Sequence, residues 1–202
     1  MLKGNKLIEA VVENCRFDGE PPWPVTAETD SQLIRLHPGM SDEELGSVLL
    51  TACVYNRTAV TPSASETLGN LVSEETMVLP GGLRFSEEGE AEVIPGCCCG
   101  LEGWREWLGV PQEGNTAWGG HDPDVWVEHA GGKVRVWQDE REGADCVEFD
   151  REEMTTLLSR VETDLGGFLA RLGEWVSHVS PGLEQAVVGH VAKNMDVRAG
   201  RT

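Results

Sequence analysis

Apolar positions in the first half of the chain recur at helical spacing behind a clear start signal. Ser41-Asp-Glu-Glu44 has the pattern of a capping box, in which the first and fourth side chains satisfy each other's backbone N–H groups. The apolar residues that follow predict a helix from Asp42 to about Tyr55. Residues 56–65 are expected to form a loop, and residues 66–72 another short helical turn.

The C-terminal part carries a longer apolar stripe at the same spacing. A second capping-box pattern, Asp150-Arg-Glu-Glu153, precedes it, and the stripe extends to Val179. We expect Gly166-Gly167 to kink or divide this long helix, because each glycine costs about 1 kcal/mol relative to alanine. Ser180-Pro181 predicts the start of a last helix, and residues 195–202 are expected to fray.

Alternation of apolar and polar residues predicts a β-hairpin in the middle of the chain. Residues 125–130 and 133–138 flank Gly131-Gly132, a two-residue turn of the favoured type. This register places three pairs opposite each other: Trp126 and Trp137, Glu128 and Arg135, and Val127 and Val136. An aromatic pair and an opposite-charge pair agree with the same register, which supports it.

Shorter patterns surround the hairpin. Residues 3–14 are compatible with a helix or a strand, and a short helix is expected at 101–108. Short strands are predicted at 32–37, 76–79, 83–86, 91–94 and 146–149.

Together these elements predict an α+β protein. We expect an antiparallel sheet with the hairpin 125–138 at its centre and helices packed on one face. The length of 202 residues suits a single α+β domain over 1–202, with the helical segment 150–194 packed on it.

The charge of the chain limits its partners. The formal net charge is −19, and residues 76–149 contribute −10 of it. An acidic field repels phosphate, so we expect no nucleic-acid partner and no anionic membrane partner, whereas a basic protein is attracted. No apolar run reaches the length of about 18 residues that a transmembrane helix needs, and the N-terminus lacks the pattern of a signal peptide.

Three consecutive cysteines form the most unusual motif, Pro95-Gly-Cys-Cys-Cys-Gly100. In an extended chain Cys97 and Cys99 would converge and Cys98 would point away, so Cys97, Cys99 and His121 are candidate zinc ligands. His129 and Cys146 are alternative sources of the remaining ligands. The alternative is that the thiols pack where the chain closely approaches other backbone, with Gly96 and Gly100 allowing the turn. Six cysteines without an export signal predict free thiols in a reducing cytoplasm.

A catalytic thiol is a further alternative. Cys99 precedes the expected helix 101–108, whose N-terminus would favour a thiolate, and His121 and Asp122 are a candidate base and orienter. Glu102 and Glu106 oppose this interpretation, because nearby carboxylates raise the pKa of a thiol.

Tryptophans cluster beside the acidic surplus. Five of the seven fall within 34 residues, and tryptophan is enriched both in cores and at binding hot spots. We expect at least three of the five in the core and the others in an exposed, acid-rimmed patch. The candidate partner-binding residues are Trp104, Trp107, Trp118, Glu102, Glu106, Asp122 and Asp124.

Two resemblances carry this interpretation further. The segment from Pro95 to Trp107, with Trp118-Gly-Gly-His-Asp-Pro123, resembles an uncharacterised family of cytoplasmic proteins from high-GC bacteria. The stretch from Val134 to about Leu169, under a fifth of the chain, is similar to the end of SUKH-type immunity proteins. That likeness implies an acidic α+β protein that binds and neutralises a toxin.

The sequence therefore favours a non-enzymatic, cytoplasmic protein-binding module, of the immunity or antitoxin kind, with a basic protein partner and no cofactor. The alternative is a zinc- or thiol-dependent protein that uses the Cys97–Cys99 loop.

Overall fold

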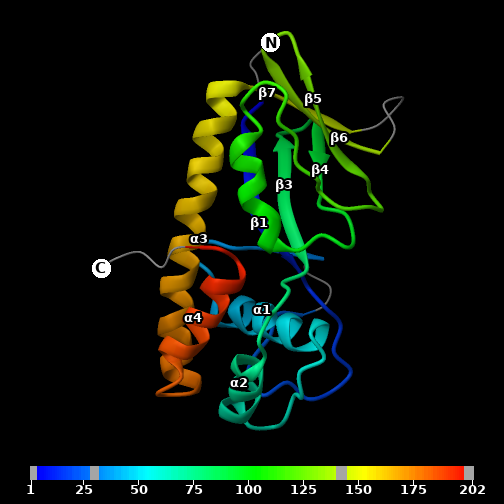
Figure 1. The fold of residues 1–202 in the computed structure, drawn as a ribbon. Coiled ribbons are helices and arrows are strands. Elements are labelled where there is room, and N and C mark those ends of the chain that lie inside the picture. Colours follow the sequence, from blue (N-terminus) through cyan, green and yellow to red (C-terminus); the bar gives the residue numbers. More distant parts are fainter. Residues whose placement is uncertain (1–3, 28–31, 140–144, 198–202) are drawn as a thin grey trace. The chain divides into compact units, whose positions relative to one another are not determined.

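The chain is an α+β protein with antiparallel sheets and a C-terminal helical segment, as predicted (Figure 1). The structure is a computed structural model that describes residues 4–27, 32–139 and 145–197. It divides into two compact units: a first unit of Met1–Val11 and Gly81–Glu162, and a second unit of Val12–Pro80 and Thr163–Thr202.

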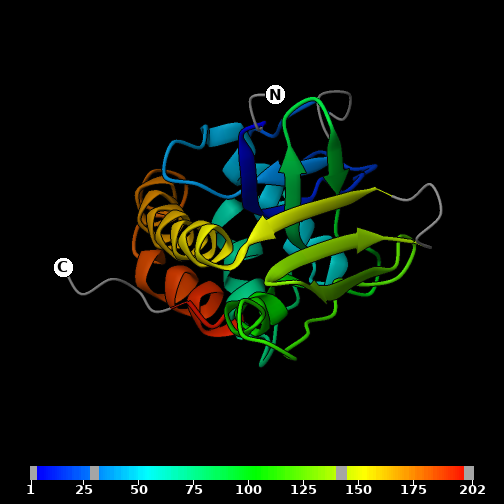
Figure 2. The same cartoon turned by 90° about the horizontal axis from the view of Figure 1, so that it is seen from above.

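Two sheets contain the described strands. One is four-stranded in the order β2-β1-β3-β4, and the other is three-stranded in the order β5-β6-β7. The strands of the first sheet are β1 (Lys6–Glu13), β2 (Leu33–Arg35), β3 (Gly81–Glu87) and β4 (Ala91–Val93). The strands of the second, seen side by side in Figure 2, are β5 (Val125–Ala130), β6 (Lys133–Gln138) and β7 (Cys146–Asp150). The segment 3–14, left open by its pattern, therefore forms a strand.

The hairpin β5–β6 has the predicted register. Trp126 lies opposite Trp137, and their rings stack with centroids 5.8 Å apart and planes 11° apart. Glu128 lies opposite Arg135. Gly131 and Gly132 have φ values of 58° and 86°, which the tight turn requires and glycine adopts without a steric cost.

The two faces of the three-stranded sheet differ in character. One face carries apolar side chains that are fully buried in the core of the first unit: Val134, Val136, Val147 and Phe149. The opposite face carries ion pairs, among them Arg135–Glu148 at 2.7 Å and Lys133–Asp150 at 2.8 Å. This alternation gives the sheet one packed face and one polar face.

In the second unit, helix α1 (Asp42–Tyr55) has the predicted bounds. The Ser41 hydroxyl accepts a hydrogen bond from the Glu44 N–H, and the Glu44 carboxylate accepts one from the Ser41 N–H, so the capping box is confirmed. Every residue from Leu45 to Cys53 is buried. Trp23 contributes to this core through an indole N–H that donates to the Gly46 carbonyl at 2.8 Å.

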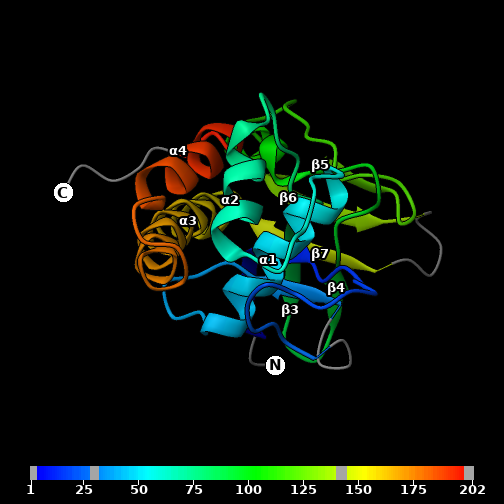
Figure 3. The same ribbon diagram turned by 90° about the horizontal axis from the view of Figure 1, so that it is seen from below.

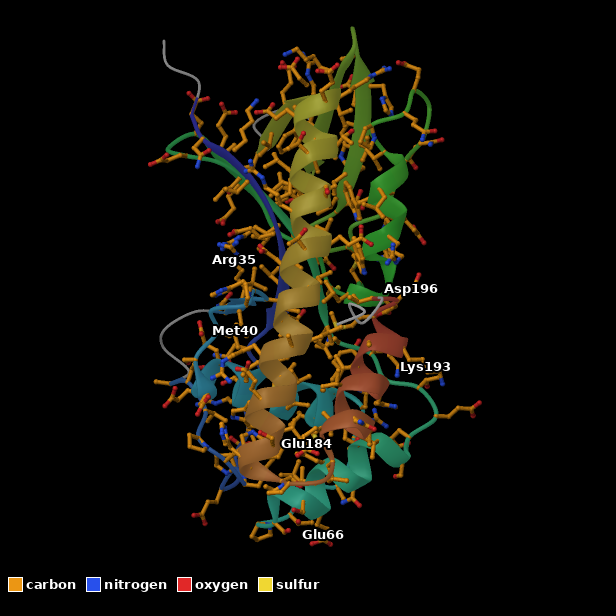
Figure 4. All side chains as sticks on the ribbon, turned by 90° about the vertical axis from the view of Figure 1, so that its left-hand side faces the viewer. Arg35, Met40, Glu66, Glu184, Lys193 and Asp196 are labelled. Carbon is orange, nitrogen blue, oxygen red and sulfur yellow. The ribbon has the colours of Figure 1, made fainter. Side chains whose placement is uncertain are left out.

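Three further α-helices are α2 (Ala64–Ser73), α3 (Arg151–Val179) and α4 (Glu184–Asn194). Helices α2 and α4, both in the second unit, lie side by side (Figures 1 and 3). Arg35 and Met40 lie beside the later turns of α3 (Figure 4), where Arg35 pairs with Asp164 at 2.9 Å and the Met40 carbonyl accepts from Arg171 at 3.1 Å. Within the described residues, no helix is both long and apolar enough to cross a membrane.

The predicted strand at 76–79 is wrong. This segment is irregular, because asparagine side chains occupy the backbone groups that a neighbouring strand would need. The Met77 N–H donates to the Asn194 side chain, and both the N–H and the carbonyl of Val78 bond to the Asn56 side chain.

The C-terminal helices also differ from expectation in detail. Helix α3 continues through Gly166-Gly167 without division. Packing explains why glycine is found at position 167, since a Cβ there would lie 2.7 Å from the Pro38 side chain. Helix α4 begins at Glu184 rather than at Pro181, because Gly182 has a φ of 95°, outside the helical region. The expected fraying from residue 195 is wrong for the chain up to Val197, because Val197 is buried. Residues 198–202 lie outside the described residues.

Candidate functional site

The two parts of the cysteine–tryptophan motif lie against each other in the first unit. Residues 95–100 and 118–121, here called the paired loops, are joined by backbone hydrogen bonds. The Gly96 N–H donates to the Gly119 carbonyl at 2.8 Å, and Cys97 and His121 exchange two bonds of 2.6 and 3.1 Å. Cys97 and His121 are therefore direct antiparallel partners, although 23 intervening residues separate them.

Glycines make this approach possible. A Cβ on Gly96 would lie 2.2 Å from the Pro123 carbonyl oxygen and 2.4 Å from that of His121. Gly120 has a φ of 102°, and a Cβ there would lie 2.6 Å from the Gly96 carbonyl oxygen. The expected close approach of backbone at Gly96 is thus confirmed.

The three adjacent thiols do not share one environment. Cys97 and Cys98 are exposed, and their Sγ atoms lie 3.8 Å apart. Cys99 is half-buried, with its Sγ 3.9 Å from the Gly100 carbonyl oxygen. The extended chain that would bring Cys97 and Cys99 together is wrong, because Cys98 has a φ of 61° and turns the backbone.

The surroundings of Cys99 oppose a nucleophilic role. Burial, together with the negative charges of Glu102 and Glu106, raises the pKa of Cys99 to about 11. The expected effect of these two carboxylates is confirmed. At neutral pH the Cys99 side chain is a thiol, which is a poor nucleophile and a poor metal ligand.

The metal candidates Cys97, Cys99 and His121 are only partly brought together. The bridge places Cys97 and His121 opposite each other, whereas Cys99 lies apart with a buried thiol. In the part of the chain that the structure describes, no three His, Cys, Asp or Glu side chains are grouped so that they could hold a metal ion.

Two of the candidate partner-binding tryptophans are interior. Trp104 and Trp107 are 1% and 3% exposed. Trp107 packs on Phe85 with ring centroids 4.7 Å apart, and the Arg105 guanidinium covers Trp104 at 4.7 Å from its centroid. Both residues lie on helix η1 (Leu101–Gly109) and face the core, so their expected place on a partner surface is corrected.

Trp118 has the opposite placement. All seven tryptophans lie in the described residues, and among them Trp118 alone is exposed, at 47%. Its ring meets the His121 imidazole edge-on, with centroids 4.9 Å apart and planes 71° apart. A large apolar side chain is therefore held at the surface by a neighbouring ring.

Exposed carboxylates follow each of the paired loops in the sequence. Asp122 and Asp124 are exposed and follow the second loop directly. Glu102 and Glu106 are exposed on helix η1, close enough to Cys99 to influence its thiol. We call the five exposed residues that remain from the predicted set the docking face: Glu102, Glu106, Trp118, Asp122 and Asp124.

One carboxylate of this region was missed. Exposed Asp139 accepts a hydrogen bond from the Asp124 N–H at 3.0 Å through its side chain, and its own N–H donates to the Asp124 carbonyl at 2.7 Å. The hairpin pairs Val125 with Gln138, so extending the predicted register by one step places Asp139 opposite Asp124. The predicted register of the hairpin was therefore enough to place Asp139 beside Asp124.

Comparison with family models, curated proteins and solved structures gives no match to this chain.

Proposed function

We propose that the chain is a protein-binding module that docks a basic partner protein through the docking face. The observation that carries this proposal is Trp118, a large aromatic side chain that is 47% exposed and is followed closely in the sequence by exposed Asp122 and Asp124. Binding interfaces combine a desolvated aromatic anchor with a charged rim, and this region offers both.

The sign of the charge selects the partner. The chain carries 35 acidic and 16 basic residues, and the docking face contributes four carboxylates. Such a surface attracts a basic protein over a distance and repels acidic ones. The similarity of residues 134–169 to SUKH-type immunity proteins favours a toxin as this partner, and the function we propose is neutralisation by binding rather than catalysis.

The cysteines favour the cytoplasm as the place of action. All six occur as thiols, and a reducing compartment maintains thiols in that state. Exposure of both Cys97 and Cys98 suits such a compartment, because an oxidising one would modify them.

The test is capture of partners from a lysate of the source organism on the immobilised chain, followed by kinetics with the purified partner. We expect a basic protein whose association slows roughly tenfold or more from low to physiological salt. Trp118→Ala should weaken binding by about 2 kcal/mol or more, as for a hot-spot residue. The double reversal Glu102→Lys/Glu106→Lys should make association with the partner slower than that of the wild-type chain.

A matched control uses the second unit. Glu75 and Glu174 are exposed there, and Glu75→Lys/Glu174→Lys makes the same change in net charge away from the docking face. This control variant should bind the partner more tightly than Glu102→Lys/Glu106→Lys does. An acidic partner, or equal losses in the two charge-reversed variants, would contradict the proposal.

Because Trp118 is exposed, Trp118→Ala should unfold at the same denaturant concentration as the wild type, whereas Trp107→Ala in the core should cost about 3–5 kcal/mol.

A further inference from the structure

The neighbouring thiols of Cys97 and Cys98 are both exposed, and their Sγ atoms are 3.8 Å apart. In an extended chain, neighbouring side chains would point to opposite sides. The left-handed φ of 61° at Cys98 removes that geometry, so the two sulfurs approach each other. All six cysteines lie in the described residues, and these two alone are exposed.

The surrounding structure holds this conformation. A non-glycine residue seldom has a left-handed φ, and it keeps one only where its neighbours fix it. Backbone bonds do so on both sides of the pair. Cys97 exchanges bonds of 2.6 and 3.1 Å with His121, and the Cys99 carbonyl accepts one of 3.3 Å from the Gly81 N–H. The approach of the two sulfurs therefore depends on the folded chain.

Cys99, the third thiol of the loop, has a different environment. It is half-buried, and its Sγ lies 3.9 Å from the Gly100 carbonyl oxygen. Burial, together with the charges of Glu102 and Glu106, raises the pKa of Cys99 to about 11. Exchange between thiols and disulfides requires a thiolate and access to it, so Cys99 is a poor participant.

We propose that Cys97 and Cys98 are a site of reversible oxidation, at which a low-molecular-weight disulfide converts the two thiols into one disulfide bond. One thiolate attacks a sulfur of the small disulfide, whose S–S bond breaks and releases its other half as a thiolate. The second protein thiolate attacks the mixed disulfide and releases the remaining half. The two protein thiols thereby lose two electrons and two protons, and the small disulfide takes up both and becomes two thiols.

The position of the two cysteines in the chain makes this bond easy to reduce. Cα atoms of neighbouring residues are about 3.8 Å apart, whereas those of ordinary disulfides are about 4.4–6.8 Å apart. A disulfide between neighbours is therefore strained, and strained or exposed disulfides are the ones that small thiols reduce again. The pair thus suits a reversible modification rather than a permanent link.

The test exposes the full, reduced chain to oxidised glutathione and then blocks the remaining thiols with N-ethylmaleimide. The tryptic peptide of residues 85–105 contains all three adjacent cysteines. We expect mass spectrometry to show this peptide with two hydrogen atoms lost and one maleimide, which fragment spectra place on Cys99. Later addition of reduced glutathione should restore all three thiols of the peptide.

Serine variants identify the participants. Cys97→Ser and Cys98→Ser should each stop at a mixed disulfide with one glutathione, because the second thiol is missing. Cys99→Ser, the matched control from the same loop, should form the bond as the wild type does. Circular dichroism confirms that each variant is folded.

A further measurement tests whether the fold brings the sulfurs together. In mixtures of reduced and oxidised glutathione, the equilibrium constant for forming the bond should be roughly tenfold or more higher in the folded chain than in guanidinium chloride, since the loop is already arranged for it.

Three outcomes would overturn the proposal. They are a bond that includes Cys99 in the oxidised wild type, glutathione retained on the wild type as it is on the serine variants, and equal equilibrium constants in the folded and unfolded chain. Each is independent of partner capture, so failure of this site and failure of the docking face are distinguishable.

Discussion

At the scale of single residues, some placements follow from local chemistry and others depend on distant contacts. The close approach at Gly96 and the influence of Glu102 and Glu106 on Cys99 were predictable, because they follow from small size and from proximity along the chain. The conformation of Cys98 was not, since a left-handed φ at a non-glycine residue depends on the tertiary contacts that hold it.

The thiols provide a prediction at this scale. Burial is the main cause that raises the pKa of Cys53 to about 12 and of Cys99 and Cys146 to about 11, and it also raises the pKa of Cys15. A raised pKa keeps these groups protonated near pH 8, so iodoacetamide should alkylate only exposed Cys97 and Cys98 rapidly. Peptide mapping by mass spectrometry gives the rate for each cysteine.

Alkylation of Cys99 should accelerate about tenfold for each pH unit until the pH approaches 11, since only the thiolate reacts. In guanidinium chloride all six cysteines should react alike, which is the control for access. Labelling of Cys99 as fast as Cys98 in the folded chain at pH 8 would show that its thiol is not protected.

At the scale of elements, the sequence predicted those whose signals are local. Helix α1 and the hairpin β5–β6 have the expected bounds, because a capping box and a two-glycine turn are each contained within a few residues. The segment 76–79 has an apolar pattern but no strand partner, since its hydrogen bonds come from Asn56 and Asn194, far along the chain. No local pattern could indicate those partners.

The same limit applies to the candidate site. Periodicity on helix η1 could not decide whether Trp104 and Trp107 face a core or a partner, because both uses require one apolar face. The pairing of residues 97 and 121 is also set by tertiary structure rather than by spacing. The identity of Trp118 as the exposed tryptophan came only from the fold.

The hairpin itself gives a quantitative prediction. The stacked rings of Trp126 and Trp137, 5.8 Å apart, should be energetically coupled by about 0.5–1.5 kcal/mol. A double-mutant cycle of the two alanine variants, with the free energy of unfolding from urea titrations, measures this coupling. The control cycle combines Trp126→Ala with Val134→Ala, whose side chain lies on the opposite face of the sheet, and should give less than about 0.5 kcal/mol. Equal coupling in the two cycles would argue against a specific ring contact.

At the scale of the whole molecule, the dominant feature is the net charge of −19. Ion pairs such as Arg135–Glu148 do not reduce this excess, because 35 acidic and 16 basic residues leave 19 negative charges even if every base is paired. An excess of one sign keeps a protein soluble but opposes the compact state through self-repulsion.

Screening should therefore stabilise this chain. Raising NaCl from 0.01 M to 0.15 M shortens the Debye length from about 30 Å to about 8 Å. We expect the unfolding temperature to rise by about 2–4 °C for each kcal/mol of repulsion relieved, as measured by scanning calorimetry. Tetramethylammonium chloride should act equally, since screening does not depend on the chemistry of the cation. A lower unfolding temperature would mean that the ion pairs outweigh the repulsion.

The division into two units limits how the chain can be cut into pieces that each keep a whole unit. Neither unit is one continuous piece of sequence, because the chain changes unit after Val11 inside β1, after Pro80 at the start of β3, and after Glu162 inside α3. A break of the chain after Pro80 leaves fragments of both units in each piece, whereas a break after Val11 or Glu162 leaves one unit whole and divides the other. The paired loops therefore share their unit with the first part of β1, which a fragment that begins at Gly81 would lack.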